Sequence, residues 1–84
     1  MINIEQQIRY FLTEIILFSD DSLEYSNDDS LIENGIIDSL AVLELVLFTQ
    51  ETFGIKVEDR EITPDNFDSV ANLSNFIREK LNHR

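Results

Sequence analysis

The sequence predicts an all-α fold: a small four-helix bundle with three main helices, one short helix and a long first loop. Three segments repeat apolar residues at the three- and four-residue spacing of one helix face. No segment alternates apolar and polar residues as a half-buried strand does. With 84 residues the chain has room for a single domain, 1–84, and its 43% of apolar residues favours a compact core.

The first helix is predicted at roughly 4–18. Asn3 can cap its start, and Gln6, three residues further on, is the partner that a capping box requires. The apolar residues of this segment share one helix face: Ile4, Ile8, Phe11, Leu12, Ile15 and Phe18. The segment therefore has the pattern of an amphipathic helix that packs on a core.

A long loop is predicted from Ser19 to Asp38, where the helical period is lost and turn-forming residues are frequent. Loops of this length are usually functional or disordered. Five apolar residues recur inside it: Leu23, Leu31, Ile32, Ile36 and Ile37. We therefore expect the loop to be pinned to the core.

The second helix is predicted to begin at Asp38 or Ser39, either of which can act as its N-cap, and to run to Phe53. Gly54 can adopt the left-handed conformation that ends helices. Ile55 can then make the apolar contact that accompanies such an ending.

The last part of the chain is predicted to hold a short helical turn and a third long helix. Between residues 56 and 67, Pro64 rules out a continuous helix. Asp68 or Ser69 then caps the last helix. Its apolar face comprises Val70, Leu73, Phe76 or Ile77, and Leu81. Basic residues near its end suit the negative pole of the helix dipole: Arg78, Lys80 and Arg84.

The second helix has two apolar stripes on nearly opposite sides. The stripe that fits the core comprises Val42, Leu45, Val46, Thr49 and Phe53. The other comprises Leu40, Leu43 and Leu47, with Glu44 and Glu51 directly beside it. This leucine stripe is either a partly exposed docking surface rimmed by carboxylates or a face that the long loop covers. Periodicity alone leaves both interpretations open.

The composition excludes several classes of function. Seventeen acidic residues against six Lys and Arg give a net charge of −11, which disfavours nucleic acids and membranes and favours partners with basic patches. The absence of cysteine excludes thiol catalysis and thiolate metal sites. The acidic loop lacks the glycine and glutamate spacing of an EF-hand, so we expect no metal.

We also expect no catalytic activity, because the single histidine, His83, is the penultimate residue and offers a serine nucleophile no credible base. The first residues lack the basic and apolar regions of a signal peptide, and no apolar stretch is long enough to span a membrane. The sequence therefore favours a cytoplasmic protein, which we expect to be a monomer.

Ser39 is the remaining candidate for chemistry. A serine at a helix start is most simply a capping residue. An anion attached there would, however, face unpaired backbone N–H groups and the positive end of the helix dipole. The surrounding sequence is Gly35-Ile36-Ile37-Asp38-Ser39-Leu40-Ala41-Val42-Leu43-Glu44-Leu45.

This segment resembles the attachment motif of the phosphopantetheine-dependent carrier proteins (acyl, aminoacyl and peptidyl carriers), in which Gly-x(x)-Asp-Ser-Leu opens the second helix. Two further segments resemble the family's exit from that helix and its lead into the last one: Phe53-Gly54-Ile55-Lys56-Val57 and Asn66-Phe67-Asp68-Ser69-Val70. The resemblance extends from the first helix to Leu81. Ala41 and the stretch from Ile62 to Phe67 are more similar to discrete, stand-alone carriers of specialised pathways than to those of housekeeping fatty-acid synthesis.

The resemblance implies a covalent cofactor, 4′-phosphopantetheine, which a phosphopantetheinyl transferase takes from coenzyme A and joins to Ser39. Its thiol would carry acyl or aminoacyl intermediates as thioesters in a pathway of fatty acid, polyketide or nonribosomal peptide type. The implied partners are acyl- or aminoacyl-activating and condensing or modifying enzymes with basic docking patches. The residues that we expect them to contact are Asp38, Leu40, Leu43, Glu44, Leu47 and Glu51.

The alternative is an unmodified acidic adaptor that docks a basic partner through the leucine stripe of its second helix. A small calcium buffer is a weaker rival that the acidic loop invites. The two main hypotheses differ in whether Ser39 becomes covalently modified.

Overall fold

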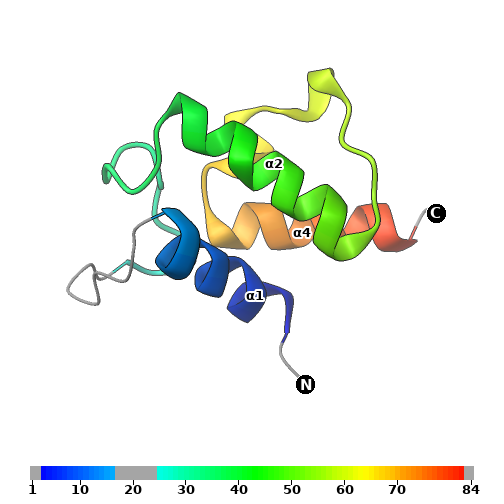
Figure 1. The fold of residues 1–84 in the computed structure, drawn as a ribbon, viewed down its shortest axis with the longest axis horizontal. Helices are drawn as coiled ribbons and strands as arrows, with labels where there is room; N and C mark the ends of the chain where they lie inside the picture. The colour runs from blue at the N-terminus through cyan, green and yellow to red at the C-terminus, as the bar shows by residue number, and fades with distance from the viewer. Residues whose placement is uncertain (1–2, 17–24, 83–84) are drawn as a thin grey trace.

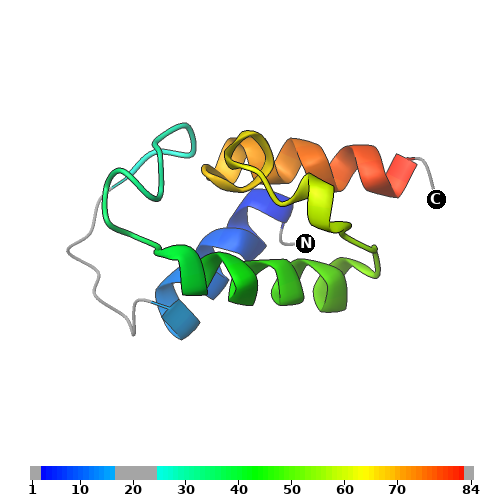
Figure 2. The same cartoon turned by 90° about the horizontal axis from the view of Figure 1, so that it is seen from above.

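The computed structural model describes residues 3–16 and 25–82, and for residues 15 and 16 it describes the backbone alone. The helices are α1 (Ile4–Phe11), η1 (Leu12–Ile16, a π-helical turn), α2 (Ser39–Phe53), η2 (Asp59–Glu61, a 3₁₀ turn), α3 (Pro64–Phe67) and α4 (Val70–Asn82). These ranges contain no strand, so the predicted all-α fold with three main helices and a short one is confirmed. In Figure 1 α1 lies beside α2 and α4, and Figure 2 shows α2 along one side of the molecule and α4 along the other.

Several predicted features lie outside the described residues. They are the helical residue Phe18, the 19–24 part of the loop with Leu23, and the tail with His83 and Arg84. The packing of Ile15 lies outside them as well, since its side chain is not described.

The first helix starts as predicted and changes form earlier than predicted. The Asn3 carboxamide oxygen accepts the backbone N–H of Gln6 at 2.8 Å, and the Gln6 side chain accepts the backbone N–H of Asn3 at 3.1 Å, which completes the capping box. The α-helix ends at Phe11, and the chain continues as the π-helical turn η1. The prediction of one helix over 4–18 was therefore wrong in form, because apolar spacing does not separate an α-turn from a π-turn with one more residue.

A single hydrophobic core joins all four helices and the loop. Its fully buried side chains include Ile8 and Leu12 from the N-terminal helix, Leu45 from α2 and Phe67 from α3. The other buried apolar members are Leu31, Ile36, Ile37, Ala41, Val46, Ile55, Val57, Val70, Leu73, Phe76 and Ile77. Phe11 and Phe48 stack at 4.3 Å between ring centroids and join α1 to α2. The face predicted for the last helix is thus confirmed, with both Phe76 and Ile77 buried.

The described part of the long loop is pinned to the core, as predicted, with one exception. Leu31, Ile36 and Ile37 are buried, and the Leu31 carbonyl accepts the backbone N–H groups of both isoleucines. Ile32 is instead 46% exposed. Leu31 and Ile32 are neighbours in a turn and only Leu31 is buried, so the loop is held to the core without a contribution from the Ile32 side chain.

Arg9 ties the same loop to α1. Its guanidinium donates to the Asn27 side-chain oxygen at 2.9 Å and to the Tyr25 carbonyl at 3.1 Å, and it lies 4.2 Å from the centre of the Tyr25 ring. Burial raises the pKa of the Tyr25 hydroxyl, and the nearby Arg9 charge opposes that rise. The Asn27 carbonyl accepts the backbone N–H of Ala71, so the loop also contacts the start of α4.

Both ends of α2 are defined by the residues that the sequence singled out. Asp38 is the N-cap, with its carboxylate accepting the backbone N–H of Ala41 at 2.9 Å. Gly54 ends the helix at φ 67°, in the left-handed region where glycine carries no steric cost. Ile55 is buried, and the Gln50 side chain accepts the backbone N–H of Val57 at 2.8 Å.

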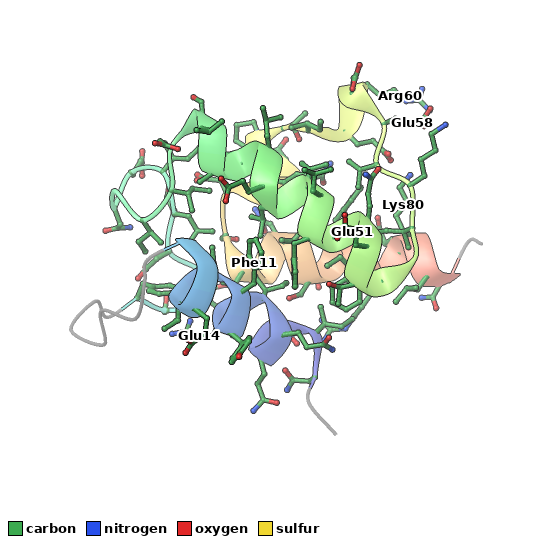
Figure 3. All side chains as sticks on the ribbon, viewed as in Figure 1. Phe11, Glu14, Glu51, Glu58, Arg60 and Lys80 are labelled. Carbon is green, nitrogen blue, oxygen red and sulfur yellow. The ribbon has the colours of Figure 1, made fainter. Side chains whose placement is uncertain are left out.

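Two of the three described ion pairs hold the helices and turns to one another. Arg78 of α4 forms a two-bond pair with Glu5 of α1 at 2.8 and 2.7 Å, and Lys80 contacts Glu61 at 2.7 Å. Arg60 pairs locally with Glu58 (Figure 3). Hydrogen bonding to Arg78 lowers the pKa of Glu5, and hydrogen bonding to Lys80 lowers the pKa of Glu61.

Replacing Glu5 with Gln is expected to lower the free energy of unfolding at pH 7 by about 0.5–1 kcal/mol, since a two-bond pair at the surface contributes little more than that. The lowered pKa of Glu5 means that its contribution is present above the ordinary glutamate pKa and is lost as pH falls through the lowered value. Urea unfolding from pH 7 to pH 3 checks both points. The control is Glu14→Gln, the same charge change at an exposed residue; equal effects of the two variants would contradict the prediction.

Replacing Asp38 with Ala is expected to destabilise the protein by about 1 kcal/mol, because the Ala41 N–H loses its side-chain acceptor. Asp38→Asn should retain most of the stability, since asparagine caps as well as aspartate does. Thermal and urea unfolding of the three proteins measure the difference. Equal stability of the alanine variant and the wild type would show that the cap contributes nothing.

Candidate functional site

Ser39 is the first residue of α2, and its side chain is exposed and free of hydrogen bonds within the described part of the chain. Asp38 performs the capping, so the serine hydroxyl is not used to close the helix. The sequence left either residue as the cap, and the structure assigns that role to Asp38. An exposed hydroxyl without a partner is available for covalent attachment.

The backbone around Ser39 also has open hydrogen-bond donors. Within the described residues, the N–H of Ala41 bonds to the Asp38 carboxylate and that of Val42 to the Asp38 carbonyl, while those of Ser39 and Leu40 have no partner. These two groups lie at the positive end of a helix of 15 residues. A phosphate on the Ser39 oxygen would therefore lie in a favourable field.

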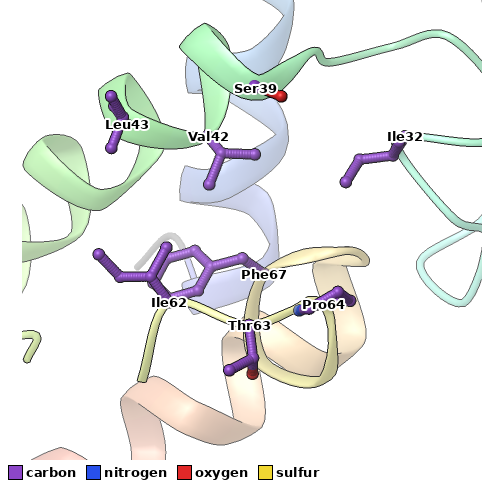
Figure 4. Close-up of a pocket in the computed structure, with 8 residues that line it drawn as sticks. All are labelled: Ile32, Ser39, Val42, Leu43, Ile62, Thr63, Pro64 and Phe67. Atoms are coloured by element: carbon purple, nitrogen blue, oxygen red, sulfur yellow. The ribbon is translucent and has the colours of Figure 1, made fainter. Parts of the chain in front are cut away.

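Ser39 lies at the edge of an apolar pocket of about 310 Å³. The pocket lies between the start of α2, the long loop and the segment that leads into α3, and Figure 4 shows these elements around it. It is lined by Ile32, Ser39, Val42, Leu43, Ile62, Thr63, Pro64 and Phe67. The site thus pairs a free hydroxyl with apolar surface from three separate elements.

Ion pairing and hydrogen bonds fix the wall of the pocket that faces α2. Glu61 is held by Lys80, and its carboxylate also accepts the backbone N–H of Glu58 at 2.9 Å. The Asn66 side chain donates to the Glu61 carbonyl at 2.8 Å. Pro64 starts α3, as the predicted break in the helical pattern requires. The segment carrying Ile62 is therefore tied to both α3 and α4.

The leucine stripe of α2 is exposed. Leu40, Leu43 and Leu47 are 66%, 53% and 55% exposed, so the described part of the loop does not cover them and the interpretation as an open surface is the correct one. The five exposed large apolar side chains among the described residues are these three, Ile32 and Tyr10. The acidic residues predicted beside the stripe, Glu44 and Glu51, are exposed as well, and so is Asp38.

The described loop and α2 contribute acidic side chains to this surface and no basic ones. The sequence contains no lysine or arginine from Tyr10 through Ile55, a stretch that includes the described loop and all of α2. Three of the described cations are paired with carboxylates elsewhere, namely Arg60, Arg78 and Lys80. An apolar stripe bordered by acidic side chains is complementary to a partner with apolar contacts and a basic rim.

Sequence reasoning missed the residues that complete the site from outside α2. The pocket is also lined by Ile32, Ile62 and Pro64. None of these residues belongs to the predicted helix that starts at Ser39, so a helical pattern could not connect them to it. In the sequence, Ile32 stands out only as an apolar residue in a mostly polar loop. Its buried apolar neighbours have the same property, so this property does not distinguish an exposed residue of the site from a residue of the core.

Two other kinds of site are absent from the part of the chain that the structure describes. Among residues 3–16 and 25–82, no group of three or more His, Asp or Glu side chains is arranged to hold a metal ion. Within the same ranges no helix is long and apolar enough to cross a membrane.

Comparison with known proteins identifies the family. No protein-family model matches this chain. The D-alanyl carrier proteins of Streptococcus pyogenes serotype M5 (strain Manfredo) and of serotype M1 are each 34% identical to it over 67 residues, which cover 80% of this chain and 82% of theirs. A chain in a crystal structure of an FAD-dependent dehydrogenase matches with a TM-score of 0.71 and 28% identity, over 83% of this chain and 97% of that chain. This non-catalytic helical chain therefore belongs to the carrier protein family that includes the D-alanyl carrier proteins.

Proposed function

We propose that Ser39 carries a 4′-phosphopantetheine arm and that the thiol of this arm bears acyl or aminoacyl groups as thioesters. The observation that carries the proposal is the free, exposed Ser39 hydroxyl within Asp38-Ser39-Leu40, in a chain of the carrier family. A phosphopantetheinyl transferase would form the bond between the Ser39 oxygen and the phosphate of the arm, with coenzyme A as donor.

The residues present fit such a group. The phosphate would lie next to the unpaired N–H groups of Ser39 and Leu40, at the positive end of α2. Because Asp38 already supplies the cap, modification of the serine removes no hydrogen bond from the fold. When bound, the cofactor supplies the thiol that a chain without cysteine lacks.

We propose that partner enzymes dock on the leucine stripe and its acidic rim, that is, on Asp38, Leu40, Leu43, Glu44, Leu47 and Glu51. A carrier must visit several enzymes in turn, so its complexes have to form quickly and dissociate quickly. Long-range attraction between an acidic surface and a basic rim speeds association, and a small apolar contact keeps affinity modest. The exposure and charge of these six residues support this role.

The cargo that we favour is an aminoacyl group, with D-alanine as the first candidate. The support is the name of the relatives at 34% identity, together with Ala41 at a position where carriers of fatty-acid synthesis often have an acid. The partners would then be an amino-acid-activating enzyme and the enzyme that receives the loaded group. The match to a chain in an FAD-dependent dehydrogenase structure adds flavoenzymes to the partners to be tested. Since the transferase and coenzyme A act on the chain, we place the modification in the cytoplasm.

An unmodified adaptor that docks through α2 remains the alternative function, because the exposed leucine stripe would serve it equally well. The two functions differ at Ser39, which an adaptor does not need. Loading the modified protein from a panel of activated acids and amino acids, D-alanine included, then identifies the cargo.

Coexpression with a broad-specificity phosphopantetheinyl transferase is expected to add one phosphopantetheine group to the wild-type chain and none to Ser39→Ala. Intact-protein mass spectrometry measures the change. Ser26→Ala removes another exposed serine hydroxyl and should be modified like the wild type. An unmodified wild-type chain would favour the adaptor instead.

Reversing the charge at Glu44 or placing a charge in the leucine stripe is expected to weaken recognition by the transferase. Glu44→Lys and Leu47→Asp should each raise the KM for the carrier by roughly tenfold at low salt, with the effect of Glu44→Lys shrinking as salt is added. Glu79→Lys is the matched control, since this exposed acid belongs to α4, along the other side of the molecule (Figure 2). Equal rates for all four proteins would remove α2 from the docking surface.

A further inference from the structure

We propose that Asp68 is a positioning residue that holds Ile32 as a second wall of the docking surface around Ser39. The proposal rests on the proposed function and deepens it, because it adds an element outside α2 to the surface that the transferase contacts. Asp68 follows α3 directly, and its capping role at α4 is taken by Ser69, whose hydroxyl accepts the backbone N–H of Asn72 at 3.0 Å. The prediction that either residue caps the last helix is thus resolved in favour of Ser69.

Asp68 makes three hydrogen bonds to three consecutive loop residues. Its carbonyl accepts the backbone N–H of Leu31 at 2.7 Å. One carboxylate oxygen accepts the Ser30 hydroxyl at 2.6 Å, and the other accepts the backbone N–H of Ile32 at 3.0 Å. Hydrogen bonds to a charged acceptor are stronger than those between neutral groups. The side chain of Asp68 therefore holds the Ser30 side chain before Leu31 and the Ile32 backbone after it.

The bonds of Ser30 extend this arrangement into a closed turn. The Ser30 hydroxyl accepts the backbone N–H of Glu33 at 3.1 Å, and the Ser30 carbonyl accepts the side chain of Asn34 at 2.7 Å. With Leu31 fully buried on the inner side of this turn, Ile32 is left on the outer side. A carboxylate 36 residues away in sequence thereby determines where an exposed isoleucine lies.

Ile32 lies on the same pocket as Ser39 and Leu43, opposite the start of α2 (Figure 4). Together with the leucine stripe it accounts for four of the five exposed large apolar side chains in the described chain. Glu33, next to it in sequence, is exposed and gives the loop an acidic side chain there. A transferase with an apolar contact and a basic rim would therefore meet Ser39 between two apolar walls, one from α2 and one from the loop.

The test measures KM and kcat of a phosphopantetheinyl transferase for the unmodified carrier. Ile32→Ala removes the second wall from an exposed position, so it should raise KM about fivefold and leave kcat and the melting temperature unchanged. Asp68→Ala should raise KM by a similar factor, and amide exchange at Ile32 should become faster. Asp68→Asn should restore most of the wild-type KM, because its amide oxygen can accept from Ile32 and its amide nitrogen can donate to Ser30.

The matched control is Asp65→Ala, which removes the same charge from an exposed residue of α3 whose side chain makes no hydrogen bond or ion pair in the described chain, and it should behave like the wild type. The double variant Ile32→Ala/Asp68→Ala should be no worse than Ile32→Ala alone, because Asp68 acts through Ile32. Additive effects, or a normal KM for Ile32→Ala, would overturn the proposal. If Asp68→Ala fails to fold, Ser30→Ala replaces it with the same expectation.

The outcome for the wild type separates this proposal from the proposed function. A wild-type chain that gains no phosphopantetheine overturns the carrier function and the role of Asp68 together. If the wild-type chain is modified at Ser39 and all the variants have the same KM as the wild type, the carrier function is retained and only the role of Asp68 is overturned.

Discussion

The site depends on one hydrogen bond at the start of α2, from the backbone N–H of Ala41 to the Asp38 carboxylate. A helix start needs a side-chain acceptor, and an aspartate directly before the serine supplies it. The serine hydroxyl is then left exposed at the positive end of the helix, with two backbone N–H groups beside it unpaired within the described chain. The Asp-Ser pair thus divides two tasks that a single serine could not perform together: one residue closes the helix and the other stays available for attachment.

The rest of the fold holds α2 so that its two apolar stripes meet different surroundings. The inner stripe packs on the core, with Leu45 and Thr49 fully buried and the Thr49 hydroxyl satisfied by the Leu45 carbonyl at 2.8 Å. The outer stripe remains in solvent, although the burial of its leucines would stabilise a small domain. An open apolar surface of this kind is what the proposed docking of partners requires. The absence of lysine and arginine from Tyr10 through Ile55 keeps the same surface acidic.

The sequence predicts the features that depend on neighbouring residues. It does not predict the features that depend on contacts between residues far apart in the chain. The capping box at Asn3, the helix end at Gly54 and the inner stripe of α2 are local patterns with a fixed period or spacing, and the structure confirms them. The choice between Asp68 and Ser69 as a cap needed the loop, which reaches Asp68 from 36 residues away. Leu31 is buried and its neighbour Ile32 is exposed, and this difference also depends on the contact between the loop and Asp68. The π-helical turn after Phe11 leaves no distinct trace in apolar spacing.

We propose Ser39 as the attachment point and the start of α2 as the place that accommodates the phosphate. Phosphorus NMR of the modified protein, combined with proton–phosphorus correlation, tests this proposal most directly. We expect a single phosphodiester signal that correlates with the β-protons of Ser39, together with large amide shifts at Ser39 and Leu40. A protein without such a signal after treatment with an active transferase and coenzyme A, or one in which the phosphorus correlates with another residue, would contradict it.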